Sequence, residues 1–276
     1  MINKLQEIIM RADKYIKSFI YLLSPLYKKE FGFGQDVTVP LFTVLHSYSE
    51  SILILLQNGG IFEADILLRC TMEGTVKYCY LMTGTDEQRR EKLSEYKEIL
   101  PEFDKLHDHQ KAKDAIEILR EFSNNNTKPF ETMIISNEEA EQIRNKYSKR
   151  EKTDLKQKWS YQSLLKELAK NAVEYKAQLG SLSTYATTSH YCHLDYTGLI
   201  DLNDQIRSSA REDDAFDYAH SLRIIANILS FYLFRVLEYM RCNNYYPTNI
   251  RDLCMDVAEF EKSINNELNE IIDNKL

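Results

Sequence analysis

The chain has 276 residues, of which 43% are hydrophobic and only 8 are glycine and 5 proline. So few helix breakers beside so much apolar material predict an all-α fold. The formal net charge of −7 argues against a protein that coats nucleic acid. The five scattered cysteines include no CxxC pair, which argues against a zinc ribbon or disulfide framework and fits a reducing cytoplasm.

Residues 1–34 predict an N-terminal helix that packs on a bundle. Its sequence is amphipathic, but it carries an acidic residue and no small-residue cleavage site, so we do not interpret it as a signal peptide. The chain has no uninterrupted apolar run of about 18 residues, and we expect no membrane span. The expected location is the cytoplasm.

Two strongly apolar helices follow, at 41–57 and 61–83, with an Asn-Gly-Gly turn between them. Residues 31–40 are expected to be a loop, because two glycines interrupt the pattern and Pro40 suits a helix start. The short connection predicts an antiparallel hairpin of the two helices.

The helix at 61–83 is apolar on almost every side and carries a charged ladder. Asp65, Arg69, Glu73 and Lys77 recur every fourth residue and therefore share one side of the helix. Charges in an apolar surround must be paired or must line a polar cavity. The ladder is thus a structural set of ion pairs or the floor of a site, and both interpretations stay open.

A long polar helix is predicted from about 86 to 122, with Pro101 as a kink. A loop at 123–129 and a capped helix start at 136–142 come next. Residues 144–158 then hold seven basic and two acidic side chains, a local charge of +5. This basic polar insert, near 123–158, is either a solvated segment or an RNA contact. The candidate RNA-binding residues are Lys146, Lys149, Arg150 and Lys152.

Residues 181–199 form a polar segment without Lys, Arg or Glu. On a helix, Ser189 and His193 are one turn apart, and histidine is the usual acid–base group near neutral pH. If this helix faces the charged ladder, Arg69, Glu73, Ser189 and His193 make a metal-free acid–base site. The alternative is a hydrogen-bond network that only joins two helices.

A metal site is a further alternative for the same segment. His190, His193 and Asp195 are ligand types, and Glu73 could complete a two-histidine site. On a straight helix Asp195 projects away from His190, so three-fold coordination would need a bend. We therefore expect no metal and no cofactor.

The remaining chain predicts an amphipathic helix at 161–179, a long core helix at 214–240 and a final amphipathic helix at 249–275. The expected organisation is a single domain. It comprises the N-terminal helix at 1–34, a core bundle at 35–245 with the basic insert, and a C-terminal helix at 246–276.

Two motifs carry a family resemblance. LLRCTMEG (67–74) and TTSHYCHLD (187–195), an RxxxE helix and an SxxxH helix, resemble a bacterial and archaeal helical family of unknown function, over roughly 35–240. The chain is also similar in style to HEPN proteins, helical bundles that often dimerise and include metal-independent ribonucleases of toxin and antiphage systems. The HEPN ribonuclease pattern places His four to six residues after Arg, whereas here Arg211 and His220 are separated by eight.

The resemblance implies a HEPN-like helical effector that acts in defence or as a toxin, with a partner protein or as a homo-oligomer. Its activity would be metal-independent RNA cleavage at the Arg69–His193 site. The alternative is a non-catalytic helical module that binds a partner protein or a small ligand through a polar cavity.

Overall fold

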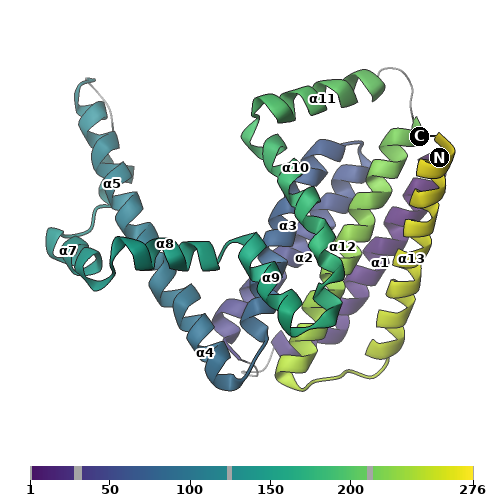
Figure 1. The fold of residues 1–276 in the computed structure, drawn as a ribbon, viewed down its shortest axis with the longest axis horizontal. Coiled ribbons are helices and arrows are strands. Elements are labelled where there is room, and N and C mark those ends of the chain that lie inside the picture. The colour runs from purple at the N-terminus through teal and green to yellow at the C-terminus, as the bar shows by residue number, and fades with distance from the viewer. Residues whose placement is uncertain (1, 28–32, 123–125, 210–213, 276) are drawn as a thin grey trace. The chain divides into compact units, whose positions relative to one another are not determined.

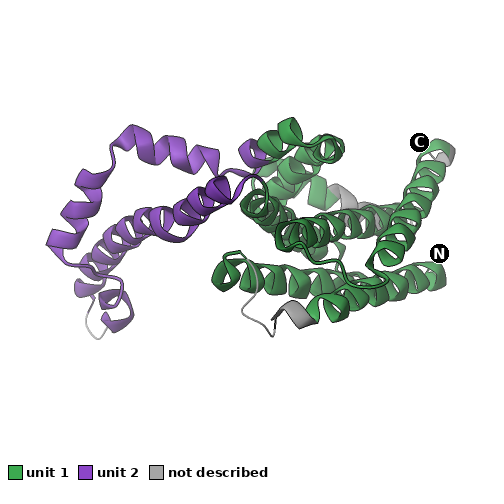
Figure 2. Cartoon of the chain, turned by 90° about the horizontal axis from the view of Figure 1, so that it is seen from below, with its two compact units in different colours: residues 1–83, 165–276 green, residues 84–164 purple. Residues whose placement is uncertain are grey.

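The computed structural model describes residues 2–27, 33–122, 126–209 and 214–275. These residues form helices and no strand, which confirms the all-α prediction. The chain divides into two compact units, residues 1–83 with 165–276 and residues 84–164 (Figure 2). The second unit is therefore an insertion in the sequence of the first. Unit 2 begins at Gly84, so it extends well beyond the basic insert that the sequence places near 123–158.

Unit 1 is built around α3, which packs against α2, α12 and α10 (Figure 1). Its long helices are α1 (Ile2–Tyr27), α2 (Gln35–Gln57), α3 (Ile61–Met82), α12 (Asp214–Asn243) and α13 (Ile250–Lys275). The predicted core helices are confirmed, since α2, α3 and α12 carry large, fully buried side chains such as Phe42, Tyr78 and Tyr232. Helices α1 and α13 cover this core on one side.

The α2–α3 hairpin is close-packed for a local reason. A Cβ on Gly74 of α3 would lie 2.5 Å from Leu45 Cδ2 of α2, so glycine permits the approach. The turn between the helices uses Gly59 at φ +79°.

The start of α2 differs from the prediction. The helix begins at Gln35, and Pro40 lies inside it, so residues 35–40 of the expected loop are helical. Proline lacks the N–H that would bond to the carbonyl of Asp36, which is a small loss so close to the helix start. Gly34, at φ +56°, sets the chain direction into the helix.

Unit 2 contains the predicted long polar helix, divided by a π-helical turn. Its elements are α4 (Asp86–Ser94), the turn η1 (Glu95–Ile99), α5 (Leu100–Arg120), α6 (Lys128–Glu131), α7 (Asn137–Lys146) and α8 (Lys149–Lys158). The turn ends just before Pro101, where the sequence predicted a kink. Ser136 caps α7 by accepting a hydrogen bond from the Glu139 N–H, as expected.

Within unit 2, the Glu95 carboxylate on the π-helical turn links that turn to the end of α8. Glu95 accepts hydrogen bonds from Lys158 Nζ at 2.6 Å and from Trp159 Nε1 at 2.9 Å. The side chain of Glu95 is largely buried, so its charge is compensated by this lysine. The boundary of the unit falls within α9 (Tyr161–Asn171), which two short 3₁₀ turns follow.

The polar segment at 181–199 is two helices rather than one. The first, α10 (Ser181–His193), ends at Leu194, whose φ of 48° is left-handed, and α11 (Tyr196–Ser209) begins after it. Asp195 caps α11 by accepting the Gly198 N–H at 3.0 Å. A Cβ on Gly198 would lie 2.4 Å from the His190 carbonyl oxygen. The corner between the helices therefore depends on this glycine.

Two helices are long and apolar enough to cross a membrane by length and composition, Gln35–Gln57 and Ala215–Asn243. The sequence analysis did not anticipate them. A core helix of a bundle passes the same test, and both helices pack on α3. This is weak evidence for a membrane span.

Candidate functional site

Arg69 and Glu73 of the charged ladder on α3 face α10, and Tyr185 is the residue that they meet. The Tyr185 hydroxyl accepts a hydrogen bond from Arg69 Nη2 at 3.1 Å and donates one to Glu73 Oε2 at 3.0 Å. The Arg69 guanidinium also lies over the Tyr185 ring, 4.6 Å from its centroid. Glu73 accepts a further bond from Lys77 Nζ at 2.7 Å.

These contacts set the ionisation of the cluster. Burial alone would raise the pKa of Glu73, but the hydrogen bond and charge of Lys77, together with Tyr185 and Arg69, hold it below its usual range. Burial, reinforced by the Glu73 charge, raises the pKa of Tyr185 to about 12. At neutral pH the carboxylate is charged and the phenol is protonated, as this bridge requires.

Ser189 and His193 do not join this cluster. Ser189 is half-buried on α10, and His193 is exposed at the last residue of that helix. Within the described part of the chain, neither side chain makes a hydrogen bond to Arg69 or Glu73. The structure thus brings together two of the four predicted site residues, Arg69 and Glu73, and joins them through Tyr185.

The first charge of the ladder has partners that the sequence analysis did not assign to it. Asp65 is fully buried, and its Oδ2 lies 2.5 Å from Nε2 of His220 on α12. Arg223 Nη2 donates to Asp65 Oδ1 at 2.7 Å and lies 3.0 Å from Oδ2. We call Asp65, His220 and Arg223 the buried-carboxylate cluster. Asp65 is therefore compensated by residues of α12, because its side chain points toward α12 instead of along α3.

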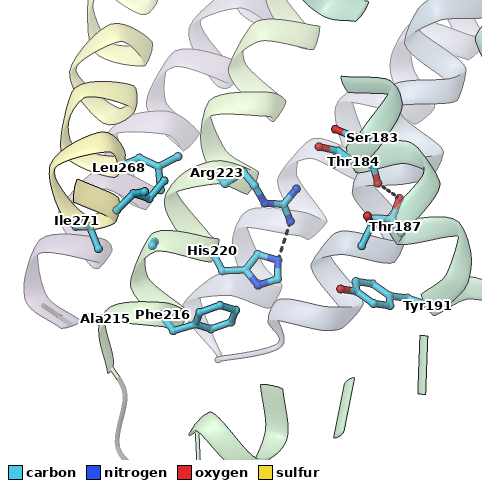
Figure 3. A pocket seen from close by; sticks show the side chains of 13 residues that line it. Ser183, Thr184, Thr187, Tyr191, Ala215, Phe216, His220, Arg223, Leu268 and Ile271 are labelled. Carbon is cyan, nitrogen blue, oxygen red and sulfur yellow. Dashed lines mark hydrogen bonds between the residues drawn. The ribbon is translucent and has the colours of Figure 1, made fainter. Parts of the chain in front are cut away.

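The two contacts of His220 Nε2 belong to different tautomers of its ring. Nε2 donates to Asp65 when it carries a proton, and it accepts from Arg223 Nη2, at 2.7 Å, when it does not. Figure 3 shows the contact between Arg223 and His220 as a dashed line. His220 Nδ1 makes no hydrogen bond to another described residue, which leaves it to interact with a bound molecule.

The buried-carboxylate cluster forms one side of a pocket of about 500 Å³ between α10, α12 and α13. Figure 3 shows Ser183, Thr184 and Thr187 on α10 opposite Arg223 and His220. A further wall is apolar. It consists of Ala215, Phe216, Ala219, Leu268, Ile271 and Ile272. The pocket lies entirely in unit 1.

His190 and Asp195 form a pair that explains the HxxHxD spacing. His190 Nδ1 lies 2.6 Å from Asp195 Oδ2, and Asp195 also caps α11. Asp195 is exposed, so burial raises its pKa only slightly. The hydrogen bond from His190 is the main reason that the pKa of Asp195 lies below its usual range. Among the described residues, no group of three or more His, Cys, Asp or Glu side chains is arranged to hold a metal ion.

The candidate RNA-binding residues lie on exposed parts of α7 and α8, and two of them face carboxylates. Lys146 Nζ lies 2.9 Å from Glu102, and Arg150 Nε lies 3.5 Å from Asp154. Lys152 Nζ lies 3.5 Å from the Arg144 carbonyl oxygen. The side chain of Lys149 forms no hydrogen bond or ion pair with any residue that the structure describes. Nearby acids thus offset part of the positive charge that the sequence shows.

The sequence analysis missed His220 and Arg223 as site residues. It named His220 in the comparison with the HEPN pattern, not as a site residue, and it did not single out Arg223. One signal was available, because a carboxylate as deeply placed as Asp65 needs a cationic partner. A histidine and an arginine about one turn apart on the long core helix α12 are the residues that meet this need.

The fold and the pocket define an all-helical protein whose larger unit contains a pocket with one polar and one apolar wall. The family described as "Family of unknown function (DUF5677)" matches residues 35–210, and the chain belongs to this family. Membership of a family of unknown function was expected from the two motifs. The match includes α3 and α10, whereas His220 and Arg223 lie beyond it. No curated protein and no solved structure matches the chain.

Proposed function

We propose that this protein binds a small molecule in the pocket between α10, α12 and α13. The observation that carries the proposal is the pocket itself. Its volume of about 500 Å³ lies within the range of about 300–1,000 Å³ that is usual for ligand sites. It combines apolar walls with a few converging polar groups, which is the composition of such sites.

The polar groups of the pocket are suited to a ligand rather than to one another. The hydroxyls of Thr184 and Thr187 make no hydrogen bond to any described residue, whereas Thr188 donates to the Thr184 carbonyl oxygen at 2.9 Å. The pocket is partly open to solvent, so its apolar wall is in contact with water when no molecule is bound. A bound molecule would cover this apolar surface, which favours binding.

A neutral, environment-sensitive dye tests whether the pocket accepts small molecules. We expect prodan to bind once per chain with a blue-shifted emission, because its naphthalene body suits the apolar wall. Ala219→Phe fills the pocket from α12 and should abolish this binding while circular dichroism stays helical. Ala186→Phe, on an exposed position of α10, is the matched control and should bind as the unaltered protein does. Equal binding by both variants, or none by the unaltered protein, would overturn the proposal.

Acid–base cleavage of RNA is a second candidate function. It is favoured by one observation, the imidazole of His220 held by a buried carboxylate beside a guanidinium. In such a reaction Nδ1, unprotonated while Nε2 donates to Asp65, takes the proton of a ribose 2′-hydroxyl. The 2′-oxygen attacks the adjacent phosphorus and expels the 5′-oxygen, which takes a proton from water. Arg223 would stabilise the charge on the phosphoryl oxygens.

This second candidate moves the acid–base group from His193 to His220. The test measures RNA integrity and growth on expression of the unaltered protein, of His220→Asn and of His193→Ala. Loss of cleavage in His220→Asn alone supports this site, and loss in His193→Ala alone supports the site expected from the sequence. Intact RNA with all three would end the ribonuclease proposal.

The remaining expectations are proposals of the same kind. They are a HEPN-like effector role in antiphage defence or as a toxin, a cytoplasmic location, and a homo-oligomer or a partner protein. The growth experiment above addresses the effector role directly.

A further inference from the structure

We propose that the ligand of this pocket is a monoanionic organic acid, with its carboxylate between α10 and α12 and its apolar body against α13. This inference rests on the proposed binding function and names the class of ligand. It is argued from the charges, the donors and the apolar surface of the pocket.

The charges of the buried-carboxylate cluster limit the charge of the ligand. Asp65 is fully buried and takes up one positive charge from Arg223. The cluster is therefore neutral when His220 is neutral and carries +1 when His220 is protonated. A monoanionic ligand balances the charge of +1 that the cluster carries when His220 is protonated. A dianion would leave at least one negative charge uncompensated in a partly desolvated site, which is unfavourable.

The donors of the pocket fit the two oxygens of a carboxylate. Arg223 uses Nη2 for Asp65, and its remaining N–H groups are on the pocket side of the cluster (Figure 3). The hydroxyls of Thr184 and Thr187 lie on the opposite wall, on α10. A carboxylate placed between these walls accepts a charge-assisted hydrogen bond from Arg223 and a neutral one from a threonine.

The rest of the pocket offers contact surface without further polar partners. Phe216, Leu268, Ile271 and Ile272 contribute apolar side chains from α12 and α13. Phe216 is 43% exposed and Ile272 is 42% exposed, so part of their surface is open for an aromatic or aliphatic ligand to cover. The carboxylate of the ligand would thus meet the polar walls of the pocket, and its apolar body would meet the apolar wall.

Three probes with one aromatic body separate the effect of the head group. They are 2-naphthoate, 2-naphthalenemethanol and 2-naphthyl phosphate, which carry a monoanion, a neutral hydroxyl and a predominantly dianionic group. Titration calorimetry on the full chain should show one site, with 2-naphthoate at least about tenfold tighter than the alcohol, the usual effect of one charge-assisted bond. The phosphate should bind more weakly than the naphthoate.

A conservative variant tests the assigned cation. Arg223→Lys keeps the charge beside Asp65 but loses the second group of N–H donors, so the preference for naphthoate over the alcohol should fall toward equality. Arg241→Lys is the matched control, because Arg241 lies on the same helix and pairs with Glu238 at 2.9 Å outside the pocket. It should keep the full preference. Thr187→Val removes a hydroxyl from an exposed position and should weaken naphthoate alone.

The outcomes distinguish this inference from the proposed function. Equal affinities for naphthoate and the alcohol, or tighter binding of the phosphate, overturn the ligand class while prodan binding still supports the pocket. Naphthoate binding that Arg223→Lys leaves unchanged also overturns the assignment. Failure of prodan to bind overturns the function on which the inference rests.

Discussion

Tyr185 and Glu73 join α10 to α3 through a single hydrogen bond of 3.0 Å, in which the phenol is the donor. The same oxygen accepts from Arg69, so one hydroxyl holds both charged residues. This bond determines which face of α10 meets α3. The opposite side of α10 is thereby left to line the pocket, where Thr184 and Thr187 are found.

The bridging role of this hydroxyl predicts the effect of Tyr185→Phe. The variant keeps the ring beneath Arg69 but removes the donor and acceptor between the two charges. We expect a loss of about 1 kcal/mol in the free energy of unfolding, measured by urea denaturation followed by circular dichroism. Tyr196→Phe, at a tyrosine that is 79% exposed, should change it by a few tenths at most. An equal loss in both variants would show that the bridge contributes nothing.

Asp65 is expected to matter more for stability than Arg69. Asp65→Asn leaves Arg223 and His220 without their carboxylate, and breaking a buried pair costs about 3–5 kcal/mol. Arg69→Ala removes one hydrogen bond and one cation–π contact of a half-buried residue, which is about 1–2 kcal/mol. Comparing the two unfolding free energies checks the assignment. The reverse order would mean that the charged ladder, and not α12, compensates Asp65.

His109 makes the stability of unit 2 depend on pH. It is fully buried, and its Nδ1 accepts the Ile135 N–H at 3.1 Å. Burial, followed by the charges of Lys113 and Arg144, lowers the pKa of His109 from 6.5. The unfolded chain therefore binds the proton first, and unit 2 should lose stability as the pH falls below about 6.5, with full stability above it.

The only tryptophan, Trp159, lies in unit 2 and reports this transition by fluorescence. His109→Asn keeps an acceptor for the Ile135 N–H without a titrating ring, and it should flatten the dependence between about pH 8 and pH 5.5. His107→Gln, at an exposed position two residues away, is the control and should keep the dependence. A curve that His109→Asn leaves unchanged would assign the effect to another group.

The corner between α10 and α11 predicts a large difference between two glycine substitutions. Gly198→Ala places a Cβ 2.4 Å from the His190 carbonyl oxygen, and moving backbone atoms to relieve this clash costs free energy. We expect a destabilisation of about 1–3 kcal/mol. Gly180→Ala meets nothing within 4 Å and should be neutral or slightly stabilising. Thermal unfolding of both variants measures the difference, and similar melting temperatures would contradict the close approach.

Hydrophobic periodicity was sufficient to predict the core helices. The segments 41–57, 61–83 and 214–240 were predicted from apolar spacing, and the structure places all three at the centre of unit 1. The facing of α3 and α10 followed from the need of buried charges for polar neighbours. The helices depend on local sequence, and the facing of α3 and α10 depends on which residue types can be buried together, so both could be predicted.

The partners of the charged side chains could not be predicted in the same way. Residues four apart on α3 point in directions that differ by about 40°, because four residues turn a helix through about 400°. Over the length of the ladder this rotation carries Asp65 to α12 while Arg69 and Glu73 meet α10. The left-handed conformation of Leu194, which ends α10, could not be predicted either, because leucine does not favour this conformation.

The position of unit 2 in the sequence has a consequence for synthesis of the protein. Helix α3 ends at Met82, and its main long-range partner α12 ends at Asn243, which is 243 − 82 = 161 residues later. At about 5–20 residues per second, the ribosome needs roughly 8–32 s to make this stretch. During that time the α2–α3 hairpin presents the apolar surface that α12 will cover. This nascent hairpin is where we expect a chaperone to bind the growing chain.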